Sequence, residues 1–334
     1  MTIDLKGRSF LTLLDYTEEE IRYLLDLAKL YKIAKKLDRS HKKLDTKNIA
    51  LIFEKDSIKT RGAFDVAAMD LGIGVTNIGA SELQGDRRES IKDFARGFGK
   101  IYDGIAYYGG TQETLNELNE FAKIPIWNAM TIEYNPIQVL ADLLTIEEKL
   151  GYLKGANLTF VGDTKNSVVN SLMIACAKMG INFTICAPSD LYPDKSLVNE
   201  CKNISKKNKS NINLTENIQE GTKGADVIYT SPWKSILESN DISKDKIEKL
   251  TNYKVSIELM NNCSKNVIFM HCLPAFHNLE TKFGRDIYED FGIKEMEVTD
   301  EVFESNYSVV FDQSENIMHT IKAIIASTLG AEYK

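Results

Sequence analysis

A short polar segment between a predicted strand and a predicted helix carries the residues best suited to bind a ligand. It contains two hydroxyl groups, on Ser57 and Thr60, and two cations, Lys59 and Arg61. A helix N-terminus presents backbone N–H groups and the positive end of the helix dipole, and both favour an anion. The segment therefore predicts a phosphate or carboxylate site. These residues alone support equally well the alternative that Ser57 or Thr60 caps the helix while both cations are solvated.

The elements that must position this segment follow from the hydrophobic pattern. An apolar, β-branched run at residues 49–53 is typical of a buried strand. Apolar residues then recur at helical spacing over residues 64–71, and Gly72 stands where a helix C-terminus favours glycine. Ligands of open α/β sheets bind beyond the carboxyl ends of the strands, so we expect this strand, turn and helix to place the polar segment at that edge.

Strands and helices alternate along the rest of the chain, which indicates parallel sheets with crossover helices. Thr17 and Glu20 form a capping box that begins a helix over residues 17–36. Pro136 begins an apolar helix that is the best candidate for a connector between two halves. Further strands are predicted at 74–78, 101–108, 124–128, 156–161, 182–187, 227–229 and 267–270, further helices from 91 and at 112–122, 168–179, 193–206 and 315–329, and a surface loop at 205–213.

Length and composition are typical of a globular protein with two domains. The chain has 334 residues, of which 43% are hydrophobic and 27% charged. Its 41 basic and 48 acidic residues give a net charge of −7, which argues against a nucleic-acid-binding surface. No predicted strand leads through a G-x-G-x-x-G sequence into a helix, so a nicotinamide cofactor is not expected.

Cysteine and histidine usage gives predictions about compartment and metals. The five cysteines are odd in number and lack Cys-x-x-Cys spacing, which favours reduced thiols in the cytoplasm. The four histidines show no metal-ligand spacing, so we expect no metal and no cofactor, and structural roles for His277 and His319. The N-terminus lacks an apolar signal core and no apolar run is long enough to span a bilayer. We therefore expect a soluble cytoplasmic protein that binds neither membranes nor nucleic acids.

Several motifs resemble those of the aspartate and ornithine carbamoyltransferase family. Residues 57–61 (SIKTR) resemble the family's Ser-Thr-Arg-Thr-Arg loop for carbamoyl phosphate, with departures at two of five positions. Residues 271–277 (HCLPAFH), after a predicted strand, are close to a signature of ornithine carbamoyltransferases. The resemblance covers essentially the whole chain and includes residues 102–110 (YDGIAYYGG), 135–146 (NPIQVLADLLTI), 296–305 (MEVTDEVFES) and 311–323 (FDQSENIMHTIKA).

The resemblance implies a fold and an activity. The fold class is α/β, with two doubly wound parallel-sheet domains joined by long helices. Residues 1–150 would bind carbamoyl phosphate, residues 151–315 would bind the amino acid, and a C-terminal helix at 316–334 would pack back on the first domain. The implied reaction transfers a carbamoyl group from carbamoyl phosphate to an amino-acid amine, ornithine giving citrulline. The implied assembly is a homotrimer, or a multiple of trimers, with sites between subunits.

The resemblance also assigns residues to the carbamoyl-phosphate site. Cys272 would contact the attacking amine, and it is not expected to be a nucleophile because no adjacent base is identifiable. The other positions that match the family are Ser57, Thr60, Gln84, Gln138 and Leu273. The positions that depart are Ile58, Lys59, Tyr108, Asn135 and Ile317, where the family has threonine, arginine, arginine, histidine and arginine. Arg61 is expected to be an ion-pair partner within the scaffold.

The acceptor side departs from the family as well. Ser167 replaces the second of two asparagines, and Ser231 replaces an aspartate that grips the amines of ornithine. Ser235 is retained, while Ile236 replaces a methionine. Lys234 could meet an anionic group, although a solvated loop lysine is the better-supported interpretation.

These departures leave three hypotheses open. Loss of one donor to a developing oxyanion costs about 3 kcal/mol, so the loss of several predicts weak or altered activity. The protein could be an ornithine-type carbamoyltransferase with a reduced site, or a transferase for another acceptor or acyl phosphate. It could also be a catalytically silent homologue kept as a binding or assembly subunit. Carbamoyltransferase is the best single description.

Overall fold

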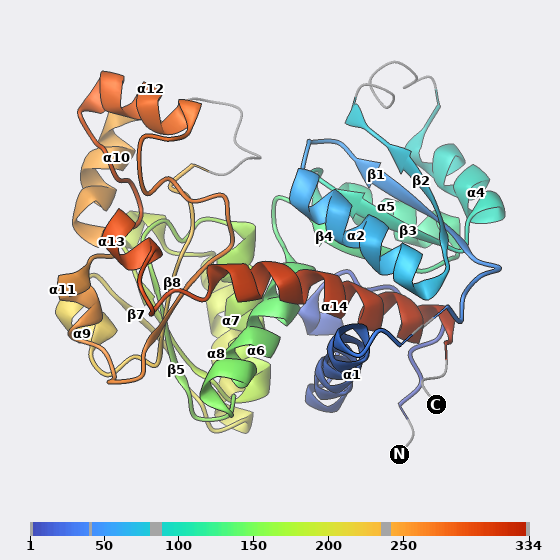
Figure 1. Ribbon diagram of the computed structural model, residues 1–334, viewed down its shortest axis with the longest axis horizontal. Helices are drawn as coiled ribbons and strands as arrows, with labels where there is room; N and C mark the ends of the chain where they lie inside the picture. The colour runs from blue at the N-terminus through green and yellow to red at the C-terminus, as the bar shows by residue number, and fades with distance from the viewer. Residues whose placement is uncertain (1–2, 40–41, 81–88, 235–241, 332–334) are drawn as a thin grey trace. The chain divides into compact units, whose positions relative to one another are not determined.

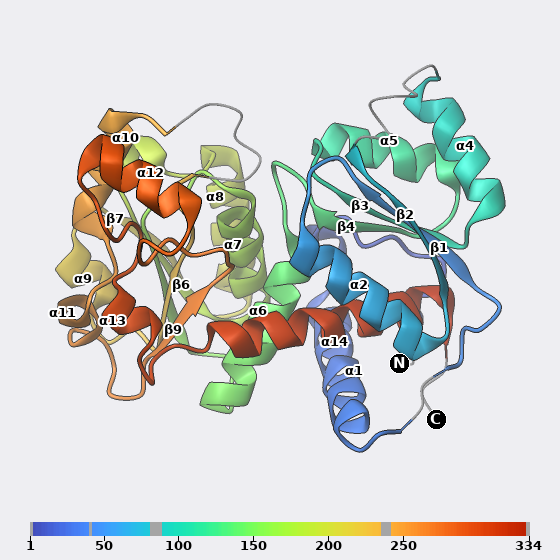
Figure 2. The ribbon, with the colours of Figure 1, turned by 45° about the horizontal axis from the view of Figure 1, so that its top comes forward.

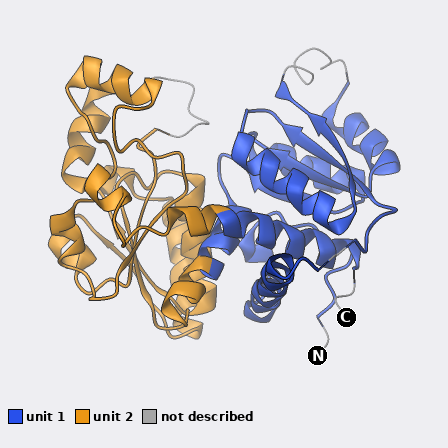
Figure 3. Cartoon of the chain, in the orientation of Figure 1, with its two compact units in different colours: residues 1–144, 315–334 blue, residues 145–314 orange. Residues whose placement is uncertain are grey.

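The chain forms two compact α/β units. The computed structural model describes residues 3–39, 42–80, 89–234 and 242–331. One unit comprises residues 1–144 and 315–334, and the other comprises residues 145–314 (Figure 3). The chain passes between the units within helices α6 (Pro136–Leu150) and α14 (Val310–Leu329). The first division falls at residue 144, six residues before the boundary expected from the sequence.

The sheet of the first unit has four parallel strands in the order β2-β1-β3-β4. Every residue of β1 after the first is buried, as expected for an interior strand of a parallel sheet covered on both faces. Parallel pairing brings the carboxyl ends of β1, β3 and β4 to one edge. The strands are β1 (Asn48–Phe53), β2 (Gly74–Ile78), β3 (Gly104–Tyr108) and β4 (Ile126–Met130).

Helices cover both faces of this sheet. Figures 1 and 2 show α4 and α5 on one face, and α2 with α14 on the other. Side chains alternate along a strand, so Ala50 and Ile52 of β1 pack with Ala95 of α4 and Leu115 of α5. The helices are α1 (Glu18–Lys36), α2 (Ile58–Leu71), α4 (Ile91–Ile101) and α5 (Gln112–Ala122), after a short 3₁₀ turn at Leu13–Asp15.

The second unit repeats the architecture with five parallel strands in the order β7-β6-β5-β8-β9. The strands are β5 (Asn157–Val161), β6 (Asn182–Cys186), β7 (Ile212–Thr215), β8 (Val227–Thr230) and β9 (Ile268–His271). Because β8 lies between β5 and β9, the loops that follow these three strands leave the sheet side by side. The fold class predicted from the sequence, two parallel-sheet α/β domains, is confirmed.

The helices of the second unit also lie on both faces of its sheet. Helices α7 (Ser167–Met179) and α8 (Lys195–Lys207) cover one face, and α9 (Ile218–Thr222) and α11 (Ile257–Met260) lie on the other (Figure 1). Among the described residues, no helix combines the length and apolar character needed to cross a membrane. The remaining elements are α10 (Lys244–Leu250), α12 (Lys282–Phe291), α13 (Asp300–Phe303) and 3₁₀ turns at Ser189–Leu191 and Thr251–Tyr253.

Three sequence-based boundaries are wrong. Strand β3 begins at Gly104 and not at residue 101, because α4 continues through Ile101. Helix α14 begins at Val310, five residues before the predicted start. Strand β7 overlaps the predicted surface loop, because a four-residue edge strand with only one fully buried residue gives a weak hydrophobic signal.

A buried ion pair joins two helices of the first unit. Lys322 on α14 is fully buried, and its ammonium contacts the carboxylate of Asp70 on α2. Lys35 also donates to Asp70, at 2.6 Å. Burial alone would raise the pKa of Asp70, but hydrogen bonds from Lys322 and Lys35 lower the pKa below its ordinary value. Burial lowers the pKa of Lys322, and Asp70 offsets only part of that effect.

Breaking this pair from one side is expected to destabilise the protein. D70N leaves the ammonium of Lys322 buried without its counter-charge, and we expect the free energy of unfolding to fall by about 2 kcal/mol. This is less than the roughly 3–5 kcal/mol lost when a fully buried ion pair is broken, because Asp70 is partly exposed. K322M removes the buried charge and is expected to cost less. Urea unfolding at pH 7 measures both changes.

The pH dependence provides the control. The folded-state pKa of Asp70 lies below its unfolded value of about 3.9, so its contribution is present at neutral pH and is lost as the pH falls through the folded pKa. The difference in free energy of unfolding between D70N and the parent protein should therefore become smaller as the pH is lowered. A gap that stays constant from pH 7 to acid would contradict this assignment.

Candidate active site

The polar segment 57–61 lies where the sequence places it, between β1 and α2. Ser57 is the residue before the first turn of α2, but its hydroxyl makes no capping hydrogen bond. It donates instead to the Thr60 hydroxyl at 2.9 Å. The simple capping role therefore does not account for Ser57, and the two hydroxyls form a pair at the helix N-terminus.

The other side chains of this segment point in different directions. Ile58 is 90% exposed, and Lys59 is exposed as well. The Arg61 guanidinium lies 5.1 Å from the Phe53 ring centroid and 3.8 Å from the Asp56 carboxylate. Arg61 therefore stabilises the end of β1, as predicted for a scaffold residue.

Tyr108, at the end of β3, is part of the core. It pairs in register with Phe53 of β1, and the two rings stack at 5.1 Å with 15° between their planes. Only 5% of Tyr108 is exposed. The neighbouring Tyr107 donates its hydroxyl to Glu54 at 2.7 Å. At the position where the resemblance implies an arginine, this chain has an aromatic ring packed against the strand that precedes the polar segment.

The N-terminus of α6 supplies the next two predicted residues. The Asn135 side-chain oxygen accepts the backbone N–H of Gln138 at 3.4 Å, so Asn135 acts as a helix cap. Gln138 donates its side-chain amide to the fully buried Asp142 at 2.8 Å. Asp142 lies one helical turn after Gln138, so this bond fixes the orientation of the Gln138 side-chain amide.

Strand register brings these segments to one edge of the sheet. Tyr108 pairs with Phe53 on one side and with Met130 on the other, so the loops after β1, β3 and β4 leave the sheet side by side. A Cβ at Gly109 would lie 3.0 Å from the Lys55 backbone nitrogen, which shows how closely two of the loops approach. Ile317 is half-buried on α14, and Gln84 lies outside the described residues.

A second polar corner forms at the ends of β5 and β8. The Asn166 side-chain oxygen caps α7 by accepting the N–H groups of Val168 and Val169, both at 3.0 Å. Its amide donates to the Asp163 carbonyl at 2.7 Å and to the Ser231 hydroxyl at 3.3 Å. One asparagine therefore links the two loops.

The carboxylate in this corner is already paired. Asp163 is 2% exposed, forms an ion pair with Lys246 at 2.7 Å and accepts the Lys165 N–H at 3.1 Å. Asp163 therefore does not take the place of the aspartate that the resemblance implies at position 231. Lys234 is half-buried, with its ammonium 5.7 Å from the Phe283 ring centroid.

Two of the predicted acceptor residues, Ser235 and Ile236, lie outside the described residues, and Ser167 is buried as the first residue of α7.

A buried histidine shapes the turn that carries Cys272 and Leu273. The His271 ring accepts the Leu273 N–H at its Nδ1 atom, at 2.9 Å. The proton of a neutral His271 is therefore on Nε2, which lies 3.2 Å from a Glu297 oxygen. The same Glu297 oxygen accepts the Phe276 N–H at 2.7 Å. Glu297 and His271 together hold both ends of the turn, a role for Glu297 that sequence reasoning did not identify.

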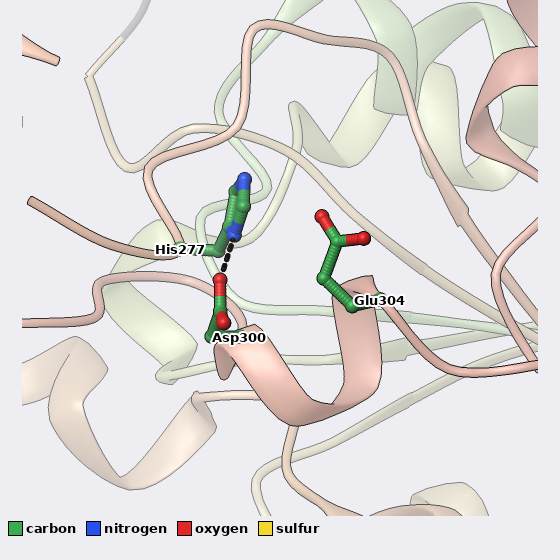
Figure 4. Close-up of side chains that lie close together, drawn as sticks. All are labelled: His277, Asp300 and Glu304. Carbon is green, nitrogen blue, oxygen red and sulfur yellow. Dashed lines mark hydrogen bonds and ion pairs between the residues drawn. The ribbon is translucent and has the colours of Figure 1, made fainter. Parts of the chain in front are cut away.

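One further group has metal-ligand chemistry. His277, Asp300 and Glu304 each offer a ligand atom, and these atoms lie within 4.8 Å of one another (Figure 4). Sequence spacing predicted no such site, because His277 is 23 residues from Asp300 along the chain. The only signal in the sequence is the four-residue interval between the two carboxylates.

Comparison with known proteins places this geometry in a family. The model of the aspartate/ornithine carbamoyltransferase carbamoyl-phosphate-binding domain matches residues 8–148, and the model of the family's Asp/Orn-binding domain matches residues 154–328. The chain belongs to the aspartate/ornithine carbamoyltransferase family, as its motifs predicted.

Individual relatives match along nearly the whole chain. A catabolic ornithine carbamoyltransferase of Treponema denticola is 52% identical over 98% of this chain and 96% of its own length. An ornithine carbamoyltransferase of Staphylococcus aureus is 49% identical over 98% of this chain and 99% of its own. The solved ornithine carbamoyltransferase of Pyrococcus furiosus has a TM-score of 0.90 at 34% identity, covering 99% of this chain and all of that one.

The polar corner of the second unit gives a prediction about stability. N166A removes the cap of α7 and is expected to lower the free energy of unfolding by about 1 kcal/mol. S231A removes only a long hydrogen bond while Asn166 keeps the Asp163 carbonyl, so we expect a change below about 0.5 kcal/mol. Urea unfolding measures both. Equal losses in the two variants would show that the Ser231 hydroxyl is structural and not reserved for a ligand.

Proposed function

We propose that this protein transfers the carbamoyl group of carbamoyl phosphate to the δ-amine of ornithine, giving citrulline and phosphate. The observation that carries the proposal is the identity of about half of all residues with ornithine carbamoyltransferases over nearly the whole chain. The HCLP turn after β9 supports it, because His271 and Glu297 hold the backbone N–H groups of Leu273 and Phe276, which follow Cys272.

The two units are proposed to bind different substrates. The first domain, residues 1–150 with the C-terminal helix 316–334, would bind carbamoyl phosphate through Ser57, Lys59, Thr60 and Gln138. Residues 151–315 would bind the amino acid near Ser167 and Ser231. The neutral amine attacks the carbonyl carbon, the bond from carbon to the phosphate oxygen breaks, and the nitrogen loses a proton. Cys272 would contact the amine and Leu273 the carbamoyl amide.

The residues at positions 108 and 135 make the rate of carbamoyl transfer the most informative quantity to measure. Tyr108 is buried in a stack with Phe53, and Asn135 uses its side-chain oxygen as a helix cap. Neither supplies the guanidinium or imidazole donor that the resemblance implies for polarising the carbonyl. We therefore propose weak or altered turnover, with a changed acceptor or a silent binding subunit as the alternatives. A homotrimer in the cytoplasm is proposed from the resemblance, and the five free cysteines are compatible with that compartment.

Turnover and binding measured together separate these alternatives. Citrulline formation is followed with carbamoyl phosphate and ornithine, and carbamoyl phosphate alone is titrated by calorimetry. We expect binding with slow citrulline formation, because Ser57, Lys59 and Thr60 remain at the helix N-terminus. S57A, which breaks the hydroxyl pair, should weaken binding. Binding without turnover would indicate another acceptor, no binding would indicate a silent subunit, and fast turnover would contradict the proposed loss of donors.

Restoring the missing donors is expected to strengthen carbamoyl-phosphate binding. The variant I58T/K59R/Y108R/N135H returns a hydroxyl, two guanidinium groups and an imidazole. A hydrogen bond to a charged group is worth about 1.5–3 kcal/mol, so we expect a gain of at least roughly tenfold in affinity by calorimetry. M69R, at a position of α2 that is 68% exposed, adds the same net charge and serves as the control. Equal binding by the quadruple variant and the parent would show that the site has diverged beyond these four positions.

A further inference from the structure

Three metal-ligand side chains converge on one short helix of the second unit. His277 Nδ1 lies 2.6 Å from an Asp300 carboxylate oxygen. The Glu304 carboxylate points toward the His277 ring (Figure 4), and one ligand atom from each side chain lies within 4.8 Å of the others. None of the three belongs to the proposed carbamoyl-transfer machinery.

Helix α13 sets the spacing of the two carboxylates. Asp300 is its first residue, and Glu304 follows its last residue. Residues four apart project from the same side of a helix, so both carboxylates face the segment that carries His277. The Thr299 hydroxyl caps the helix by accepting the Val302 N–H, and this fixes where the helix begins.

The imidazole is held in place before any ion binds. The His277 ring stacks on Phe303 at 3.8 Å with 12° between the planes. Asn278 donates to the same Asp300 oxygen at 3.1 Å, which holds that carboxylate against the ring. The side chain of His277 is only 15% exposed, whereas that of Asp300 is 50% exposed and open to an ion from solution.

The charges around the cluster favour a cation. Glu295 accepts the Asp300 backbone N–H at 2.9 Å, which brings a third carboxylate to the start of α13. Within the described residues, no lysine or arginine forms an ion pair with Asp300 or Glu304. Asp300 and Glu304 have no such basic partner in the described part of the chain and repel each other, and a divalent ion would relieve that repulsion.

We propose that His277, Asp300 and Glu304 bind one divalent transition-metal ion of the zinc class, with water completing the coordination. One imidazole nitrogen and two carboxylate oxygens form a ligand set that suits zinc, whereas calcium and magnesium prefer oxygen ligands alone. Ligand bonds of about 2.0–2.2 Å require the atoms to surround a common centre, which the exposed Glu304 can complete by a change of rotamer. Coordination requires a His277 ring nitrogen that carries no proton.

The site would connect two segments of the second unit. His277 ends the segment that carries Cys272 and Leu273, and α13 supplies the two carboxylates. The ion would therefore cross-link that segment to α13 without touching the substrates.

Metal titration of the chelator-treated full-length protein tests the proposal without any assay of turnover. Cobalt(II) is the spectroscopic probe, and zinc(II) is titrated by calorimetry. We expect one ion per chain. H277Q and E304Q should each weaken binding by roughly tenfold or more. E301Q removes an exposed carboxylate from the same helix and is the matched control, with unchanged binding expected.

Two further outcomes would overturn the assignment. If H277Q misfolds, E304Q still tests the proposal, because Glu304 is exposed. Unchanged metal binding by E304Q would contradict the proposal. A thiolate-to-cobalt charge-transfer band that disappears in C272S would place the ion on Cys272 and not on this cluster. Each readout is independent of citrulline formation, so failure here is distinguishable from failure of the proposed function.

Discussion

Parallel strand pairing is the constraint on which the functional arrangement depends. Each strand of both sheets runs in the same direction as its neighbours, so the segments that follow β1, β3 and β4 meet at one edge of the first sheet. Those that follow β5, β8 and β9 meet at one edge of the second. Helices α2 and α7 begin at these edges and direct their positive ends toward the loops. Both half-sites therefore follow from strand direction before any particular side chain is considered.

The chain has the fold of the solved ornithine carbamoyltransferases, while several residues in the candidate site differ in type from those that the resemblance implies. The loops around the candidate site are held by the Asn166 cap, the Asp163–Lys246 ion pair and the Glu297–His271 pair. The groups implied to touch carbamoyl phosphate are those that change, namely Ile58, Tyr108, Asn135 and Ile317. The family and the proposed activity both rest on similarity over the whole chain, whereas the proposed weak turnover rests on these four positions.

Local patterns predicted the fold well and the pairing of distant side chains poorly. Thr17 and Glu20 form the predicted capping box, Gly72 ends α2 in the left-handed conformation, and β1 is buried as its apolar run indicated. The short helices α9 to α13 were not predicted, since four to ten residues show too little periodicity. The Tyr108–Phe53 stack, the Asp163–Lys246 pair and the His277–Asp300 contact join residues far apart in the chain, and no local pattern encodes them.

The stack of Tyr108 on Phe53 links the stability of the empty protein to the residue at position 108. The tyrosine ring is nearly buried, so it contributes to the core of the first unit whether or not a ligand is present. An arginine at this position would hold an uncompensated charge at the sheet edge whenever the anion is absent. Replacement of Tyr108 by arginine would therefore give a less stable empty protein. Binding of the anion would have to offset that loss, so the stability of such a variant would depend on the ligand concentration.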